Sequence, residues 1–539
     1  MGKPAQLLFL VAACAAMFFL RLGATSVYQV AEARNAECAR EMMQRNDWVV
    51  PVFNGRLRTD KPALEYFFMI AAYRLGGVSE GSARFFSAVC GVLLIIATFL
   101  FASRHLGTGA AWWAALVLLA SPHLIFQFRL ATPDPYLILA TTVALYAFYE
   151  GWCASGVPGS RWRGWYLAMY LLLGVAFLAK GPVGVLLPGV TILVFLLVKR
   201  QFGWQRIRQL APWWGVLVMA AVAAPWYILV DARTHGAWTR GFFLEHNLDR
   251  FGGAMGGHGG IFLVTFLFVA VGMLPFSILF IGGARDIWRE TKRRDLLLFS
   301  LIALAVVVVF YAVSRTKLIN YTVPCYPFLA LMTAWWIGQL TAGGNAVRRA
   351  RLSVLVVAVV ASLLPVAAYA WTRTQPVLRP MGWIALVVLI YPAGCWTAYR
   401  MMRRGRRTRS LVTLAVTFMA GTLALLTGPY PALDHLTPVR KAQGSTVYPG
   451  RPVAAFGSFN NAFVFYARHP ITELPDTAAV RRFLAAHPDG LILSRGRGPG
   501  PLDQMSGLRE IRRDPEIFNS HPSRIFGLGE LPRHREAIP

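Results

Sequence analysis

Long apolar runs follow one another through most of this chain and limit what it can fold into. A helix needs about 20 mostly apolar residues to cross the hydrocarbon core of a bilayer. Thirteen stretches approach that length, near residues 6–26, 85–102, 109–127, 135–152, 163–179, 182–198, 211–230, 260–281, 297–313, 320–340, 353–371, 382–399 and 410–427. The sequence therefore predicts an all-α polytopic membrane domain over residues 1–429.

Charged residues are few and unevenly placed. They make up 15% of the chain, against about 25% in an average soluble domain. The net charge of +29 gathers in four clusters, at 199–208, 285–294, 348–351 and 400–409. With thirteen helices and a cytoplasmic N-terminus, all four clusters fall in cytoplasmic loops, as the positive-inside bias requires. This placement argues against nucleic acid as a partner, favours anionic lipid headgroups, and puts the C-terminus outside.

The first apolar segment and the cysteines each allow a further interpretation. The first apolar segment has a signal peptide as its alternative interpretation, although no small-x-small cleavage site precedes the charged loop. The six cysteines are scattered, without disulfide or metal-ligand spacing. No metal site is predicted, although acidic residues beside a phosphate are able to recruit a divalent cation.

Three outer loops interrupt the apolar runs. The first, at 27–84, contains two stretches of helical periodicity, Ala31–Arg45 and Lys61–Leu75, which we expect to lie along the membrane surface. The second holds Pro133-Asp134-Pro135. The third, at 231–259, is rich in glycine, which is typical of a mobile lid.

The C-terminal residues 430–539 have a different pattern. Strand-like runs at 453–456, 471–474 and 490–494 alternate with helical runs at 460–467 and 477–486, and a further helix and strand follow. This alternation predicts a small α/β domain outside the membrane.

Basic residues predicted outside oppose the positive-inside bias and need another explanation. They include Arg34, Arg40, Arg56, Arg58, Lys61, Arg84, Arg129, Lys180, Arg250, Arg315 and Lys317. A phosphate held at the bilayer boundary would account for them, because Arg and Lys bind phosphate through charge-assisted hydrogen bonds. The alternative is that these side chains extend to lipid headgroups, the interpretation that we favour for Arg56 and Arg84.

Two outward carboxylates are candidates for catalysis. Glu32 follows the first apolar segment and should lie at the membrane face. Asp134 stands between two prolines at the start of the fourth segment, where the alternative role is a helix N-cap. A carboxylate beside a cationic phosphate site suggests general-base catalysis on a hydroxyl group.

Several motifs occur together between about residues 20 and 330. They are AEARNAECAREM from residue 31, DWVVPVFNG, TDKP, PDPYLILA, AKGPVGVLLP, PWYILV, EHNLDRF and SRTKLINYTVP. In this order the motifs resemble GT-C glycosyltransferases of the protein-mannosyltransferase-like group, and within it the transferases that add 4-amino-4-deoxy-L-arabinose to lipid A. The resemblance implies a GT-C fold with about 13 transmembrane helices and an outer C-terminal domain, in the bacterial inner membrane.

The resemblance also implies an activity. Enzymes of the group take a sugar from a polyprenyl-phosphate carrier, such as undecaprenyl phosphate, and transfer it to an acceptor with inversion at the anomeric carbon. By resemblance, Lys61 contacts the carrier phosphate. The residues implied to help it or support the site are Arg250, Arg315, Lys317, Arg34, Asp60, Lys180, His246 and Tyr321.

This chain departs from the group's pattern at two places. The first loop usually carries Asp-Glu, which here is Ala31-Glu32. The usual Glu-Lys-Pro-Pro is Asp60-Lys61-Pro62-Ala63, which keeps the acid and the cation. We therefore expect Glu32 first, and Asp134 second, to act as the catalytic carboxylate.

Two competing functions remain at this stage. A transporter or lipid flippase would also have many apolar helices, but its charges usually lie within the spans and its halves repeat. A non-catalytic lipid-binding scaffold would explain the missing Asp at position 31. For the enzyme, lipid A, another envelope glycan or a protein would serve as acceptor.

Overall fold

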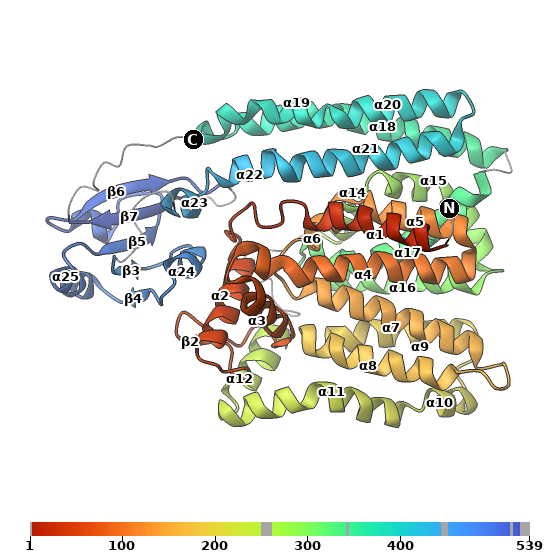
Figure 1. Ribbon diagram of the computed structural model, residues 1–539, viewed down its shortest axis with the longest axis horizontal. Coiled ribbons are helices and arrows are strands. Elements are labelled where there is room, and N and C mark those ends of the chain that lie inside the picture. The colour runs from red at the N-terminus through yellow and green to blue at the C-terminus, as the bar shows by residue number, and fades with distance from the viewer. Residues whose placement is uncertain (1–2, 249–260, 341–343, 444–450, 518–520, 529–539) are drawn as a thin grey trace.

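The computed structural model describes residues 3–248, 261–340, 344–443, 451–517 and 521–528. Roughly parallel helices form the main body, and a β-sheet lies beyond one end of it (Figure 1). Short helices of the first outer loop lie at the same end as the sheet, and the N-terminus lies towards the opposite end.

The helices of the body come from the whole length between residues 3 and 427. They are α1 (Lys3–Phe19), α4 (Glu80–Leu106), α5 (Thr108–Leu119), α6 (Pro122–Gln127), α7 (Asp134–Ala154), α8 (Trp162–Lys180), α9 (Val183–Val198), α10 (Trp204–Leu210), α11 (Pro212–Arg233), α14 (Val264–Gly272), α15 (Phe276–Thr291), α16 (Asp295–Val313), α17 (Tyr326–Gln339), α18 (Asn345–Arg373), α19 (Ile384–Val388), α20 (Ile390–Arg403) and α21 (Arg407–Thr427). Short helical connections are α12 (Ala237–Arg240), the π-helix η1 (Gly241–Leu248), the 3₁₀ helices η3 (Ile319–Cys325) and η5 (Pro376–Trp383), α22 (Pro429–Asp434) and α23 (Pro438–Gln443).

Many of these helices suit a bilayer. Within the described residues, eight helical stretches are long and apolar enough to cross a membrane. The number is nine if α14 and α15, between which the chain bends by 110°, form one span. Shorter apolar helices are Leu7–Phe19 of α1, α5 and α9. A mostly helical, multi-pass membrane protein is confirmed.

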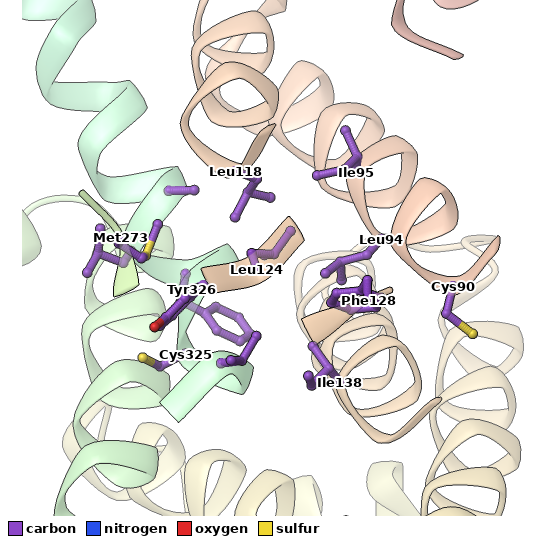
Figure 2. Close-up of a cluster of buried hydrophobic side chains, with 14 of the residues drawn as sticks. Cys90, Leu94, Ile95, Leu118, Leu124, Phe128, Ile138, Met273, Cys325 and Tyr326 are labelled. Atoms are coloured by element: carbon purple, nitrogen blue, oxygen red, sulfur yellow. The ribbon is translucent and has the colours of Figure 1, made fainter. Parts of the chain in front are cut away.

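The helix α7 is the most enclosed of the long helices. Its most apolar window is 72% buried, against 22% for Trp204–Arg233 and 28% for Asn345–Arg373. Around α7 the packing is close: Figure 2 shows Leu94 of α4, Leu118 of α5 and Tyr326 of α17 among the buried side chains. Because α7 is held on several sides, its first residue, Asp134, has a fixed position relative to neighbouring helices.

The C-terminal part forms one five-stranded sheet. Its strands have the order β4 (Thr472–Leu474), β3 (Val453–Phe456), β5 (Leu491–Arg495), β7 (Ser523–Gly527) and β6 (Arg509–Asp514). The first three are parallel, and β7 is antiparallel to both of its neighbours. The helices α24 (Ala462–Ala467) and α25 (Thr477–Ala486) connect the parallel strands. The alternation predicted up to residue 494 is confirmed, whereas the next helix is only the 3₁₀ turn η6 (Pro501–Gln504) and two strands follow.

The sheet is attached to the first outer loop. Arg40 Nη1 donates a hydrogen bond to the Phe465 carbonyl (2.9 Å). Asn54 and Ile471 exchange two hydrogen bonds, of 3.0 and 2.7 Å. The C-terminal sheet therefore buttresses the loop that carries most of the predicted site.

Candidate active site

The first outer loop folds back on itself, so that its charged residues 58–61 lie against its first helix. Two helices are present in this loop, as predicted: α2 (Val30–Gln44) and α3 (Leu64–Gly76). Between them β1 (Val52–Phe53) and β2 (Arg56–Leu57) form a hairpin. Its turn, Asn54-Gly55, has φ angles of 54° and 73°, for which Asn-Gly is the preferred pair. The hairpin directs the following residues, 58–61, towards α2.

Arg58 joins the end of the hairpin to α2. Its Nε donates to Asp60 Oδ1 (2.5 Å) and its Nη2 to Asn35 Oδ1 (2.6 Å). Burial alone would raise the pKa of Asp60, but the charge of Arg58 and its hydrogen bond, with help from Lys61 and Arg34, hold that pKa well below its usual range. Asp60 is therefore ionised at neutral pH and orients the cations around it.

Asp134 and Lys180 meet where two antiparallel helices end. Asp134 is the first residue of α7 and Lys180 is the last of α8, so each charge complements its helix dipole. They form an ion pair, and Asn320 Nδ2 donates to the second Asp134 oxygen (3.0 Å). The Lys180 ammonium also lies 4.8 Å from the centre of the Tyr321 ring. The N-cap interpretation of Asp134 is wrong, because Pro133 occupies that position and no side chain caps the helix.

Glu65 connects these two groups of residues. The carboxyl is completely buried, and Asn35 Nδ2 donates to its Oε2 (3.2 Å). Its Oε1 has no hydrogen-bond partner in the structure. Burial raises the pKa of Glu65 to about 8, with Asp134 and Asp60 adding to the rise and Arg58 and Lys61 opposing it. We call this set the outer polar cluster: Asn35, Arg58, Asp60, Lys61, Glu65, Asp134, Lys180, Asn320 and Tyr321.

Glu32 lies in a separate, closed ion pair. Its two oxygens accept from Arg84 Nε (2.7 Å) and Nη2 (2.9 Å), and Oε1 also accepts from the Ala131 backbone N–H (2.9 Å). The side chains of Glu32 and Arg84 are 1% and 2% exposed. Arg84 further donates to the carbonyls of residues 22, 25 and 26. The prediction that Arg84 extends to lipid headgroups is therefore wrong, and Glu32 is committed to holding the loop together.

Other predicted cations have different surroundings. Arg34 lies on α2, within electrostatic reach of Asp60 and with its guanidinium 5.6 Å from the Phe53 ring centre. Lys317 is buried and donates to the carbonyls of residues 312 and 314 (2.9 and 2.6 Å), so it closes the end of α16. Arg315 is exposed. Arg56 is 70% exposed and pairs with Glu473 on the sheet (3.0 Å).

Part of the third outer loop lies outside the described residues. The structure does not describe Arg250 or most of the glycine-rich stretch that is predicted to be a lid. His246 falls within η1, but its side chain is also outside the described part. Among the described residues, no group of three His, Cys, Asp or Glu side chains is placed to hold a metal ion.

Sequence reasoning missed Asn35, Glu65 and Asn320 as site residues. Asn35 and Asn320 are neutral, and nothing in their spacing marks them out. Glu65 had one available signal, a carboxylate within the apolar sequence LEYFFMI just after Asp60-Lys61. A charged group in such a run costs free energy unless it is paired or protonated, and this marks it as a candidate for function.

An apolar groove adjoins the cluster. It has a volume of about 710 Å³ and is lined by residues of α8, α9, α11, α12 and η1, including Phe177, Val216, Ala223, Tyr227 and Phe243. Phe177 lies one helical turn before Lys180 on α8. The groove is anchored to the first outer loop, since Trp238 Nε1 of α12 donates to the Arg58 carbonyl (2.9 Å). A long apolar chain in the groove would bring its polar end close to Lys180.

Comparisons with known proteins agree with the motifs. The family described as dolichyl-phosphate-mannose-protein mannosyltransferase matches residues 60–229. A protein from Edwardsiella ictaluri, named undecaprenyl phosphate-alpha-4-amino-4-deoxy-L-arabinose arabinosyl transferase, is 29% identical over 74% of this chain and 72% of its own length. A protein of the same name from Pectobacterium atrosepticum is 29% identical over 60% of the chain. An uncharacterized protein from Aquifex aeolicus is 28% identical over 59%. The last two alignments cover 58% and 61% of those relatives' lengths.

The fold is also that of a solved structure. The crystal structure of ArnT from Cupriavidus metallidurans bound to undecaprenyl phosphate superposes with a TM-score of 0.81. The superposition covers 97% of this chain and 98% of that one, at 23% sequence identity. The resemblance to GT-C glycosyltransferases of the protein-mannosyltransferase-like group is thereby confirmed.

Proposed function

We propose that this protein is an inverting glycosyltransferase that takes a sugar from a polyprenyl-phosphate carrier and transfers it to an acceptor hydroxyl at the outer face of the inner membrane. The observation that carries the proposal is the outer polar cluster, which sets lysines and a carboxylate beside an apolar groove. The groove suits an isoprenoid tail, and the lysines suit its phosphate. The relatives' name makes undecaprenyl phosphate the first carrier to test, with 4-amino-4-deoxy-L-arabinose as the sugar.

In the proposed reaction, Asp134 is the carboxylate that accepts a proton. Glu32 has both oxygens bound by Arg84, so a substrate hydroxyl would have to displace a buried ion pair to reach it. Asp134 also has both oxygens bound, by Lys180 and Asn320, but the side chains of Asp134 and Lys180 are 9% and 12% exposed, so this pair is more open to a substrate than the Glu32 pair. The acceptor O–H gives its proton to Asp134 as its oxygen bonds to the anomeric carbon. The bond between that carbon and the phosphate oxygen breaks, and the polyprenyl phosphate leaves with the bonding electrons.

The cations stabilise the leaving phosphate rather than protonate it. Preorganised positive charges placed where negative charge develops are typically the largest contribution to such catalysis. Lys61 and Lys180 fill this role, with Arg34 and Asp60 in support. Tyr321 positions Lys180. Lys317 supports the site indirectly by closing the end of α16. Arg250 and Arg315 keep the phosphate-side roles that the resemblance implies, and His246 remains a supporting residue.

The proposed topology has thirteen crossings and a cytoplasmic N-terminus. It puts the outer polar cluster and residues 430–539, as a separate α/β domain, on the periplasmic side. The four basic clusters support this orientation, because all then lie in the cytoplasm. The acceptor is lipid A or another envelope molecule with an accessible hydroxyl. A divalent cation is an optional addition at the phosphate, to be tested by chelation.

Reconstitution with a defined donor tests the function. Purified protein in liposomes, given undecaprenyl-phosphate-linked aminoarabinose and lipid A, should yield modified lipid A and free undecaprenyl phosphate by mass spectrometry. Comparison of envelope lipids with and without the gene identifies another acceptor if lipid A stays unmodified. Movement of intact donor across the bilayer without transfer would instead indicate a flippase.

A further inference from the structure

A basic pocket lies towards the end of the helical body that is opposite the β-sheet. It opens between α15, the beginning of α18 and α20, elements that Figure 1 places away from the sheet. Its volume is about 510 Å³. Its lining consists of Arg285, Asn345, Arg348, Arg349, Arg351, Leu352, Leu355 and Tyr399. Nothing in the proposed transfer reaction uses it.

The pocket has an excess of positive charge. Four of its lining residues are arginines and none is acidic. The nearest acid in sequence, Asp286, is already engaged, since it forms an ion pair with Arg349 and accepts from Trp336 Nε1 (3.0 Å). In the part of the chain that the structure describes, Arg285, Arg348 and Arg351 take part in no ion pair. The Nε atom of Arg349 is buried and has no hydrogen-bond partner. Arg285, Arg348 and Arg351 are exposed, so an anion that enters the pocket would meet them without displacing an ion pair.

The wall of the pocket is also partly apolar. Leu352 and Leu355 lie on α18 beside the arginines, and Leu352 is 59% exposed. Tyr399 of α20 adds an aromatic ring with a polar tip, a residue type enriched at membrane interfaces. A free phosphate ion would leave this apolar surface uncovered, whereas a phospholipid would cover it with its glycerol and acyl chains.

The pocket's shape is set by close helix packing. A Cβ atom at Gly283 would lie 2.5 Å from the Trp336 ring, so only glycine lets α15 approach α17 this closely. Gly282 likewise meets the Ser353 side chain of α18. These contacts, with the ion pair of Asp286 and Arg349, hold the arginines around a preformed hollow.

We propose that this pocket binds the headgroup of an anionic glycerophospholipid, with its phosphate among the arginines and its acyl chains along Leu352 and Leu355. Basic pockets between transmembrane helices on the cytoplasmic side are suited to such headgroups. The assignment to the cytoplasmic leaflet rests on the proposed topology, but lipid binding itself does not depend on the transferase activity.

The test compares phosphatidylglycerol binding by the wild-type protein, a test variant and a matched control variant. Wild-type protein in nanodiscs of phosphatidylcholine is titrated with phosphatidylglycerol, and bound lipid is counted by native mass spectrometry after release into detergent. The test variant combines Arg285→Gln, Arg348→Gln and Arg351→Gln. The matched control combines Arg404→Gln, Arg406→Gln and Arg409→Gln, which removes the same charge from exposed positions of the same end outside the pocket.

Wild type and control should retain phosphatidylglycerol, and the test variant should bind it at least tenfold more weakly. Inorganic phosphate at millimolar concentration should not compete. Equal loss in both variants would show a general charge effect and overturn the site, as would full competition by phosphate. Thermal unfolding of each variant in phosphatidylcholine confirms that it is folded, and transfer activity is measured separately, so failure of the lipid site is distinct from failure of the proposed function.

Discussion

The two buried carboxylate centres beside the first loop use similar residues for different ends. At the Glu32 centre, Arg84 and a backbone N–H occupy both carboxylate oxygens, and both side chains are almost fully enclosed. At the Asp134 centre, the side chains of Asp134 and Lys180 are 9% and 12% exposed, and the neighbouring Glu65 retains an unpartnered oxygen.

The difference shows how a charged pair can be structural or reactive. A buried pair with every hydrogen bond satisfied holds one arrangement and has little capacity for a new partner. A centre that contains three acids, two lysines and an unpartnered carboxyl oxygen can exchange partners when a phosphate arrives. This difference supports an anchoring role for Glu32 and the proposed chemistry at the outer polar cluster.

Loss of Lys61 should have a large effect on activity. Lys61→Ala removes a charge that stabilises the leaving phosphate, and loss of one such group typically costs about 10²–10³-fold in rate. Single-turnover transfer from the lipid-linked donor measures the effect. Unchanged thermal unfolding checks the fold, and near-normal turnover would return Lys61 to the class of surface lysines.

Breaking the Glu32 centre should cost stability instead. Arg84→Met leaves Glu32 buried without its partner, which typically costs about 3–5 kcal/mol. The double variant Arg84→Met, Glu32→Leu should recover much of that loss, because no unpaired charge remains. Chemical unfolding in detergent measures both variants. A stable, inactive Arg84→Met protein would contradict the anchoring role.

Glu65 should give the protein a pH-dependent stability. Its pKa is raised from 4.5 to about 8, mainly by burial, so the folded state holds a proton that the unfolded chain releases. Stability is therefore fully present below about pH 4.5 and falls as the pH rises towards 8, by about 1.4 kcal/mol per unit at most. Glu65→Gln should flatten this slope in thermal unfolding between pH 5 and 9.

Glu37 offers the matched case on α2. Burial also raises its pKa to about 8, so Glu37→Gln should flatten a second, separate part of the same slope. Unlike Glu65, Glu37 accepts a hydrogen bond from Arg40 (2.6 Å), which in turn donates to the Phe465 carbonyl of the C-terminal part. The Gln variant at 37 should therefore leave the pH profile of transfer unchanged, whereas the variant at 65 should alter it.

The smallest effect on stability and transfer is expected at Arg56, in the exposed hairpin of the first loop. Arg56 is 70% exposed in its pair with Glu473, and exposed pairs contribute about 0–1 kcal/mol. Arg56→Gln should change neither unfolding nor transfer measurably. A large loss of transfer would show that the sheet edge takes part in acceptor binding.

Local patterns predicted the elements well. The strand Val453–Phe456 and the helix Thr477–Ala486 begin and end where the sequence predicted, because polar, Gly and Pro residues bound each run. The apolar runs likewise predicted the multi-pass helical body. These features depend on neighbours in sequence, which one chain displays directly.

The partners in the site depend on distant residues and were not predictable in the same way. Glu32 and Arg84 are 52 positions apart, and Asp134 and Asn320 are 186 apart. Both Glu32 and Asp134 were candidate bases from the sequence, and only the packing of α7 against α8 and η3 distinguishes their surroundings. The choice of Asp134 over Glu32 as the proposed base therefore rests on the fold.

In the proposed reaction Asp134, and not Glu32, accepts the proton of the acceptor hydroxyl. The most direct measurement is the single-turnover rate of sugar transfer by Asp134→Asn, compared with wild type at saturating donor and equal folded protein. A positioned general base contributes about 10²–10⁴-fold, so Asp134→Asn should lose at least a hundredfold in rate and still bind the donor. A near wild-type rate for Asp134→Asn, with transfer abolished in folded Glu32→Gln, would contradict this assignment.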